Sequence, residues 1–245
     1  MGPQNYKTIR SLGVDLEKTM NLGWVLIRPL GRLITWSLTK MYAIIPNYGL
    51  VVIIFAFLVK LLLNPLTKQS FVSNKKMQAL QPEILKLKER HKNDPQKLNR
   101  ATMALYKDRG VNPMGGCLPL LLQMPILISF FTVFRSTIEF RGAPFFGWIT
   151  DLSSPDTLAT VGGFPLNVLP VLMGGTMFLQ QKLMAAPGGG GQQKMMMYFM
   201  NVFFLFLFYS FPSGLNLYYS VFNILSIVQQ KYLIPDVKMA APLSK

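Results

Sequence analysis

The sequence is poor in the residues on which most enzymatic and metal sites depend. Among its 245 residues it has one cysteine, one histidine and ten Asp or Glu residues. The single cysteine, Cys117, excludes an internal disulfide and a cysteine-rich metal site. The histidine, His91, lies among lysines and arginines, and no carboxylate pair, serine elbow, phosphate-binding loop or zinc-ligand spacing is present. We therefore predict that the protein is not an enzyme and uses no cofactor or metal.

Charged residues are also scarce, and long stretches have none. Charged residues make up 14% of the chain, hydrophobic residues make up 51%, and the mean hydropathy is +0.33. Asp, Glu, Lys and Arg are all absent from 41–59, 110–134, 157–181 and 195–230. About 20 apolar residues cross a hydrocarbon core of roughly 30 Å as a helix. The composition therefore predicts an all-α polytopic membrane protein.

The uncharged stretches predict five transmembrane helices. One helix over 195–230 would measure about 54 Å, which is too long for a bilayer. The sequence Pro212-Ser213-Gly214 offers a break, so we divide this stretch at a periplasmic turn, 212–214. The expected transmembrane helices are 44–66, 114–136, 164–182, 195–211 and 215–231.

A basic segment between the first two spans has helical periodicity. Its apolar residues Met77, Leu80, Ile84 and Leu87 recur at spacings of three and four, which places them on one helical stripe. The pair Asp94-Pro95 is typical of an N-cap followed by the first residue of a second helix. We expect an antiparallel helical hairpin on the cytoplasmic membrane surface.

Before the first span, apolar residues alternate with Arg28, Arg32 and Lys40. This pattern fits an amphipathic helix in the periplasmic membrane interface, although an ordinary soluble helix has the same pattern. The segments outside the spans are expected to be the trailing edge of a missing periplasmic domain (1–23), the interfacial helix (24–43), the helical hairpin (67–113), a periplasmic loop (137–163), a cytoplasmic loop (183–194) and a cytoplasmic tail (232–245).

The net charge of +15 has two explanations. A basic field can indicate a nucleic-acid partner, but membrane proteins accumulate Lys and Arg on cytoplasmic loops whatever their function. Sixteen basic residues fall on the side of the hairpin and the C-terminus, and eight fall on the other side. We therefore expect the C-terminus in the cytoplasm, the N-terminus outside and no sequence-specific binding of nucleic acid.

Lys60 is the one charge well inside a predicted span. An unpaired charge in hydrocarbon is costly, so such a residue is a candidate functional site by default. Lys60 also lies about 8 Å along the helix from Pro65 at the cytoplasmic end, so its ammonium could instead reach the headgroups. The sequence leaves both alternatives open.

The last span carries a polar stripe, and Gln123 lies in the second span. Such side chains either bond helices to each other or line a wet cavity, and the sequence does not decide between them. The predicted spans contain no Asp or Glu, which counts against an ion- or proton-coupled transporter. The stripe consists of Asn216, Tyr219, Ser220, Asn223, Ser226 and Gln230.

Several motifs in order along nearly the whole chain resemble the YidC/Oxa/Alb family of membrane protein insertases. Each motif is modest alone, but their order and spacing make the resemblance specific. They are Asn64-Pro65-Leu66-Thr67, Val111 to Pro119 running into Gln123-Met124-Pro125, Met173-Gly174 to Gln180-Gln181-Lys182, and Phe211-Pro212-Ser213-Gly214-Leu215 with Tyr218-Tyr219.

The resemblance implies a five-helix core with a hydrophilic groove that is open to the cytoplasm and to lipid but closed toward the outside. It also implies a cytoplasmic hairpin that helps to recruit substrates. The family usually has arginine where this chain has Lys60, and lysine keeps the charge without the bidentate fork. The implied substrate-binding groove residues are Lys60, Gln123, Asn216, Tyr219 and Asn223.

The expected function is insertion and folding of nascent inner-membrane proteins in the bacterial inner membrane. Such a protein would act alone or with the Sec translocon, and its partners would be nascent chains, the lipid bilayer and, as an option, the ribosome. A positively charged half-channel would shorten the passage of a polar flank through lipid. The alternatives are a small polytopic channel or transporter and a structural partner of the Sec translocon.

Overall fold

The structure is a computed structural model, and it describes residues 28–92, 94–112, 115, 118–184 and 191–234. The predicted segment 1–23, Cys117 and most of the tail at 232–245 lie outside the described residues. The helices are α2 (Arg28–Tyr42), α3 (Tyr48–Ala79), α4 (Gln81–Arg90), α5 (Pro95–Asp108), α6 (Leu118–Ser136), α7 (Val168–Met184), α8 (Gly191–Tyr209) and α9 (Ser213–Val228). Shorter elements are the 3-10 turn η3 (Ile138–Phe140), the strands β1 (Thr157–Val161) and β2 (Phe164–Asn167), and the π-helical turn η4 (Gln229–Leu233).

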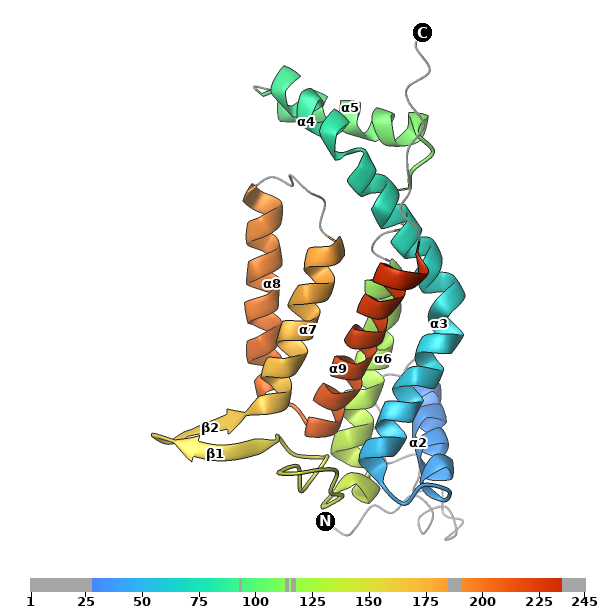
Figure 1. Cartoon of the computed structure of the whole chain (residues 1–245), viewed down its shortest axis with the longest axis vertical. Helices are drawn as coiled ribbons and strands as arrows, with labels where there is room; N and C mark the ends of the chain where they lie inside the picture. The colour runs from blue at the N-terminus through green and yellow to red at the C-terminus, as the bar shows by residue number, and fades with distance from the viewer. Residues whose placement is uncertain (1–27, 93, 113–114, 116–117, 185–190, 235–245) are drawn as a thin grey trace.

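The fold is mostly helical, as the composition predicts, and α9 lies at its centre. Helices α3 and α7 pack on α9, α8 packs on α7, and α2 packs on α6 and α3 (Figure 1). The core at the α3–α6–α9 junction is aromatic, because the ring of Phe130 stacks on Tyr218 at 4.2 Å and meets Phe55 edge-on at 5.6 Å. Both Phe130 and Tyr218 are fully buried.

Helix α3 differs from the predicted first span, 44–66, because it continues to Ala79. Pro65 lies inside the helix and has no N–H to donate, which normally favours a break. The turns beyond it are held from outside, since the Ser70 and Ser73 hydroxyls both donate to backbone carbonyls of the segment before α6. Among the described residues, α3 is the one helix long and apolar enough to cross a membrane by length and composition; α6 and α8 contain shorter apolar stretches.

Helices α4 and α5 extend from the end of α3 (Figure 1). The predicted stripe from Met77 to Leu87 does not lie on one helix, because the chain bends at Leu80 and α4 begins with Pro82 in its first turn. The predicted cap of α5 is confirmed, since Asp94 accepts a hydrogen bond of 2.9 Å from the Lys97 amide. The ends of the two helices also meet in an ion pair, in which Arg109 donates to both carboxylate oxygens of Glu83 at 2.8 and 3.0 Å.

The prediction of an all-α fold is wrong at one place, because β1 and β2 form an antiparallel hairpin. Residues 164–167, which we placed in the third span, belong to β2, and α7 begins only at Val168. The physical reason is the turn between the strands. Gly162 and Gly163 both adopt positive φ, at 58° and 85°, a conformation that glycine allows and that reverses the chain in a tight hairpin.

Candidate functional site

Lys60 lies inside the bundle. Its side chain is 7% exposed, and its ammonium donates a hydrogen bond of 2.7 Å to the hydroxyl of Ser226 on α9. The Ser226 hydroxyl in turn donates to the Phe222 carbonyl at 2.8 Å, so its oxygen is oriented to accept from Lys60. Of the two orientations that the sequence left open, the structure has the ammonium directed toward α9.

Two aromatic rings complete the surroundings of the ammonium. Its nitrogen is 4.8 Å from the ring centre of Phe222 on α9 and 5.4 Å from that of Phe71 on α3. Both distances are within the range of a cation–π attraction. No carboxylate among the described residues forms an ion pair with Lys60. The positive charge is therefore stabilised by a neutral hydroxyl and two ring faces.

The next turn of α3 continues the polar contact with the end of α9. The Gln229 amide nitrogen donates to the Asn64 side-chain oxygen and to the Thr67 hydroxyl, the second at 3.3 Å. Gln229 and Thr67 are 3% and 4% exposed, so these amide and hydroxyl groups are paired away from solvent. Gln229 begins the π-helical turn η4, and such turns are frequent at functional sites.

Further hydrogen bonds tie α3, α7 and η4 together beyond this turn. Gln230 donates to the Leu183 carbonyl at 3.0 Å, and Gln78 donates to the Met184 carbonyl at 2.8 Å. Both acceptors lie in the last turn of α7, where helix carbonyls have no intrahelical partner. From the level of Lys60 to the end of α3, polar contacts therefore join three elements that are distant in sequence.

The structure does not bring all five predicted groove residues together. Asn216 lies at the start of α9, where its amide donates to the Phe208 and Phe211 carbonyls at 3.2 and 3.4 Å and closes the turn from α8. It precedes Ser226 by ten residues, which is about 15 Å along a helix. Its position fits the helix-bonding alternative, and it is remote from Lys60.

Tyr219 and Asn223 occupy intermediate levels of α9. The Tyr219 ring packs edge-on against the Phe208 ring, with 5.5 Å between the ring centres. Gln123 of α6 faces the Tyr219 hydroxyl. The Tyr219 hydroxyl makes no hydrogen bond of good geometry to a described residue. Asn223 is 8% exposed and lies one turn before Ser226 on the same helix face. Of the predicted residues, Asn223 is thus the one on α9 closest to the level of Lys60.

Several residues of the site were not among those predicted for it. Ser226 belongs to the polar stripe on the last span, and Asn64 and Thr67 belong to one of the family motifs. The sequence therefore contained patterns from which these three residues could have been predicted. Phe71 and Phe222 could not have been predicted from the sequence, because apolar side chains are common throughout such helices. Within the described ranges, no three His, Cys, Asp or Glu residues come close enough to hold a metal ion.

Comparison with known proteins identifies close relatives. The family model described as 60Kd inner membrane protein matches residues 40–240. The membrane protein insertase YidC of Chlorobium phaeovibrioides is 43% identical over 99% of this chain and 44% of its own length. The protein of the same name from Pelobacter propionicus is 42% identical over 95% of this chain and 43% of its own length.

A solved structure is also similar. It is described as an active YidC insertase crystal structure with the first transmembrane domain resolved, and it has a TM-score of 0.66 and 28% sequence identity, covering 83% of this chain and 46% of that chain. The chain therefore spans less than half the length of each of these relatives.

Proposed function

This chain belongs to the 60Kd inner membrane protein family, with relatives named membrane protein insertase YidC, and we propose that it inserts nascent membrane proteins into the bilayer. The observation that carries the proposal is the buried ammonium of Lys60, which no carboxylate of the described residues neutralises. An ammonium has three donors, and Ser226 accepts from one of them. The remaining N–H groups are available to acidic or polar groups of a substrate when α3 and α9 separate.

The mechanism is physical and needs no covalent step. Passing a polar flank through hydrocarbon is costly because its charged and backbone groups lose water without gaining partners. Lys60, with Asn64, Thr67 and Gln229 one turn away, offers such partners at the α3–α9 interface. The hydrophobic segment of the substrate meanwhile moves sideways into lipid. Asn223 extends the proposed groove toward Gln123 and Tyr219.

The proposed membrane arrangement has five spans, formed by the first part of α3 and by α6, α7, α8 and α9. Helix α2 would lie at the outer interface, since Gly31, Ile34, Thr35 and Leu38 are buried on one of its faces and its charged residues lie on another. The α4–α5 pair and the C-terminus would lie in the cytoplasm. The 16-to-8 distribution of basic residues supports this orientation.

Helices α4 and α5 form the proposed cytoplasmic recruiter of substrates. Neither helix has a buried residue, and both have basic residues in the last turn. A pair attached through the end of α3 and not packed into the core can change its position at little cost in stability. The proposed partners are nascent membrane proteins and the Sec translocon, with the ribosome as a further candidate.

Reconstitution into liposomes tests the function. The purified chain should insert a short phage-coat-like protein without other components, whereas a channel or transporter should move solute and a structural partner of the translocon should do neither. Lys60→Arg should retain insertion, and Lys60→Ala should slow substrates with acidic flanks more than neutral ones, because the lost attraction acts in a low-dielectric site. Lys68→Ala is the matched control, since it removes a charge from an exposed position of the same helix.

Labelling with a membrane-impermeant thiol reagent tests the orientation. In a Cys117→Ser background, a cysteine replacing Thr160 in β1 should react from outside intact cells, and one replacing Gln96 in α5 should react only after lysis. The opposite labelling result would overturn the proposed membrane arrangement.

The insertion assay has its own contradicting outcome. If Lys60→Ala inserts acidic and neutral substrates equally well, Lys60 has no part in the mechanism.

A further inference from the structure

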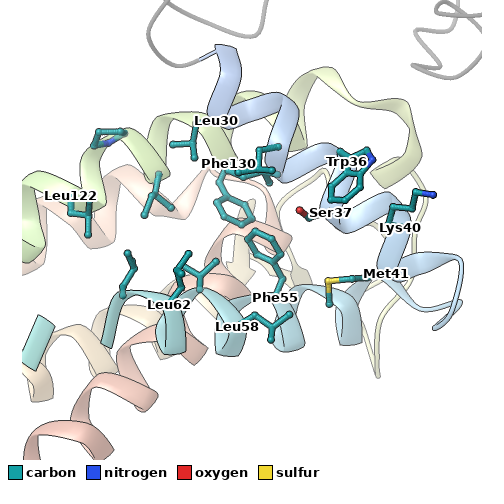
Figure 2. Close-up of a pocket in the computed structure, with 16 residues that line it drawn as sticks. Leu30, Trp36, Ser37, Lys40, Met41, Phe55, Leu58, Leu62, Leu122 and Phe130 are labelled. Carbon is teal, nitrogen blue, oxygen red and sulfur yellow. The ribbon is translucent and has the colours of Figure 1, made fainter. Parts of the chain in front are cut away.

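A second feature lies on the face of α3 away from Lys60. Helices α2, α3 and α6 enclose an open pocket of about 580 Å³, which we call the α2–α3–α6 groove. Figure 2 shows side chains from the three helices converging on it. The residues that define it best are Leu33, Trp36, Phe55, Leu62, Leu122 and Phe130.

The groove is apolar along its length and charged at one end. Of its 16 lining residues, Ser37 and Lys40 are the two with a hydroxyl or an ammonium. Both lie near the end of α2, so they mark the same end of the groove, and Figure 2 shows the Lys40 side chain at its edge. Lys40 forms no ion pair with any carboxylate in the part of the chain that the structure describes. An occupant should therefore be amphiphilic, with one anionic end.

The dimensions fit a single alkyl chain. On α3 the lining extends from Phe55 to Leu63, which are eight residues apart, or about 12 Å along the helix. An extended alkyl chain is narrow and apolar, so it suits an open apolar groove of this length.

The exposure of several leucine side chains along the groove also favours an apolar occupant. Leu62 is 77% exposed, Leu33 is 58% exposed and Leu58 is 49% exposed. Trp36, near the charged end, is 57% exposed, and tryptophan favours the depth of lipid headgroups. The groove thus presents an apolar interior and an aromatic and cationic mouth.

We propose that the α2–α3–α6 groove binds one acyl chain of an anionic phospholipid, with the phosphate at the Lys40 ammonium. Lys40 favours an anionic headgroup, because it is the one charged residue that lines the groove. The bound lipid fills the space between α2 and the two longer helices. The site requires only that the chain lies in a bilayer, so it is independent of insertase activity.

Native mass spectrometry of the full chain tests the site. The detergent-solubilised protein is mixed with equal amounts of phosphatidylglycerol and phosphatidylcholine that have the same acyl chains. We expect retention of one phosphatidylglycerol with about a fivefold preference, as expected for one lysine facing an anionic headgroup. Lys40→Gln should abolish this preference, and Arg32→Gln should leave it unchanged, because Arg32 is exposed on the same helix but does not line the groove.

A second pair of variants tests the apolar part. Val59→Trp places an indole in the groove and should abolish retention of both lipids, whereas Ile54→Trp, on an exposed position of α3 outside the groove, should not. The proposal would be overturned if the unchanged protein retained the two lipids equally. It would also be overturned if the Lys40 and Arg32 variants lost the preference for phosphatidylglycerol to the same extent. Crosslinking of position 59 to a nascent chain with no lipid adduct would also overturn it, since a peptide would then be the occupant.

Discussion

Lys60 and Ser226 are 166 residues apart in sequence, and their side chains are joined by a hydrogen bond of 2.7 Å that links α3 to α9. One turn further along α3, Gln229 bonds Asn64 and Thr67 across the same two helices. Elsewhere this interface is largely aromatic and aliphatic. Separation of α3 from α9 at the level of Lys60 therefore requires a small set of polar contacts to break, and under the proposed function the polar groups of a substrate would replace them.

The coupling between Lys60 and Ser226 is measurable by a double-mutant cycle with Lys60→Met and Ser226→Ala. We expect a coupling energy between about 0.6 and 1.7 kcal/mol, which are the mean and the maximum of double-mutant cycles for hydrogen bonds between membrane helices. The measurement is the free energy of unfolding in bilayer discs. Ser220→Ala is the matched control, because the Ser220 hydroxyl donates to the Asn216 carbonyl of its own helix. A coupling to Ser220 as large as that to Ser226 would contradict a specific α3–α9 contact.

The sequence predicted a mostly helical fold, and the structure confirms it, because long apolar stretches without charges favour helices. It predicted the ends of these helices less well. Pro65 was expected near the end of the first span, yet α3 continues to Ala79, since contacts from Ser70 and Ser73 to a distant segment stabilise the later turns. Such contacts are tertiary, and local propensity does not contain them.

The same limit applies to the candidate site. The predicted residues were chosen because they are polar in an apolar helix, and Lys60 lies where a tertiary contact gives it a partner. Asn216 is also a polar residue in an apolar helix, but its amide donates hydrogen bonds to backbone carbonyls at the turn between α8 and α9. Periodicity places a residue on a helix face, but the neighbouring element on that face decides whether it bonds a backbone or lines a site.

Gly214 is expected to be intolerant of a side chain. A Cβ atom there would lie 2.4 Å from Cε1 of Phe134, a fully buried ring, and the Gly214 amide donates to the Leu152 carbonyl at 3.0 Å. Gly214→Ala should therefore lower the free energy of unfolding by about 1–3 kcal/mol, as in other overpacked cores. The matched control is Gly175→Ala on α7, where a Cβ meets no atom within 4 Å. Equal stability of the two variants would show that the Phe134 ring moves aside freely.

Asp156 is expected to fix the start of α7. Its Oδ2 atom accepts from the Val168 and Leu169 amides at 3.0 and 2.7 Å and from the Trp148 indole at 3.3 Å. Asp156→Ala should lower stability by about 2 kcal/mol, the upper part of the range for a lost helix cap. Asp156→Asn should lower it less, because an amide oxygen still accepts. Chemical unfolding gives both values. In a background in which Trp24 and Trp36 are replaced by phenylalanine, a red shift of Trp148 fluorescence in the alanine variant alone would locate the loss at this residue.

The cap of α5 provides a pH test. The Lys97 amide donates a hydrogen bond to the Asp94 carboxylate. This bond is the largest of the influences that hold the pKa of Asp94 below its ordinary value of 3.8. A carboxyl with a depressed pKa in the folded state contributes stability above its unfolded pKa, and that contribution is lost as the pH falls through the folded pKa. The first turn of α5 should therefore be stable at pH 5 and should open below about pH 3.8.

Hydrogen exchange of the amides at 97–100, corrected for the intrinsic rate at each pH, measures this opening. Asp94→Asn is the decisive comparison, because asparagine caps a helix about as well but does not titrate. Protection in this variant should be the same at pH 5 and at pH 3. If both proteins lose protection equally on acidification, Asp94 is not the acid-sensitive group and the prediction is wrong. If only the unchanged protein loses protection, Asp94 is the acid-sensitive cap of α5.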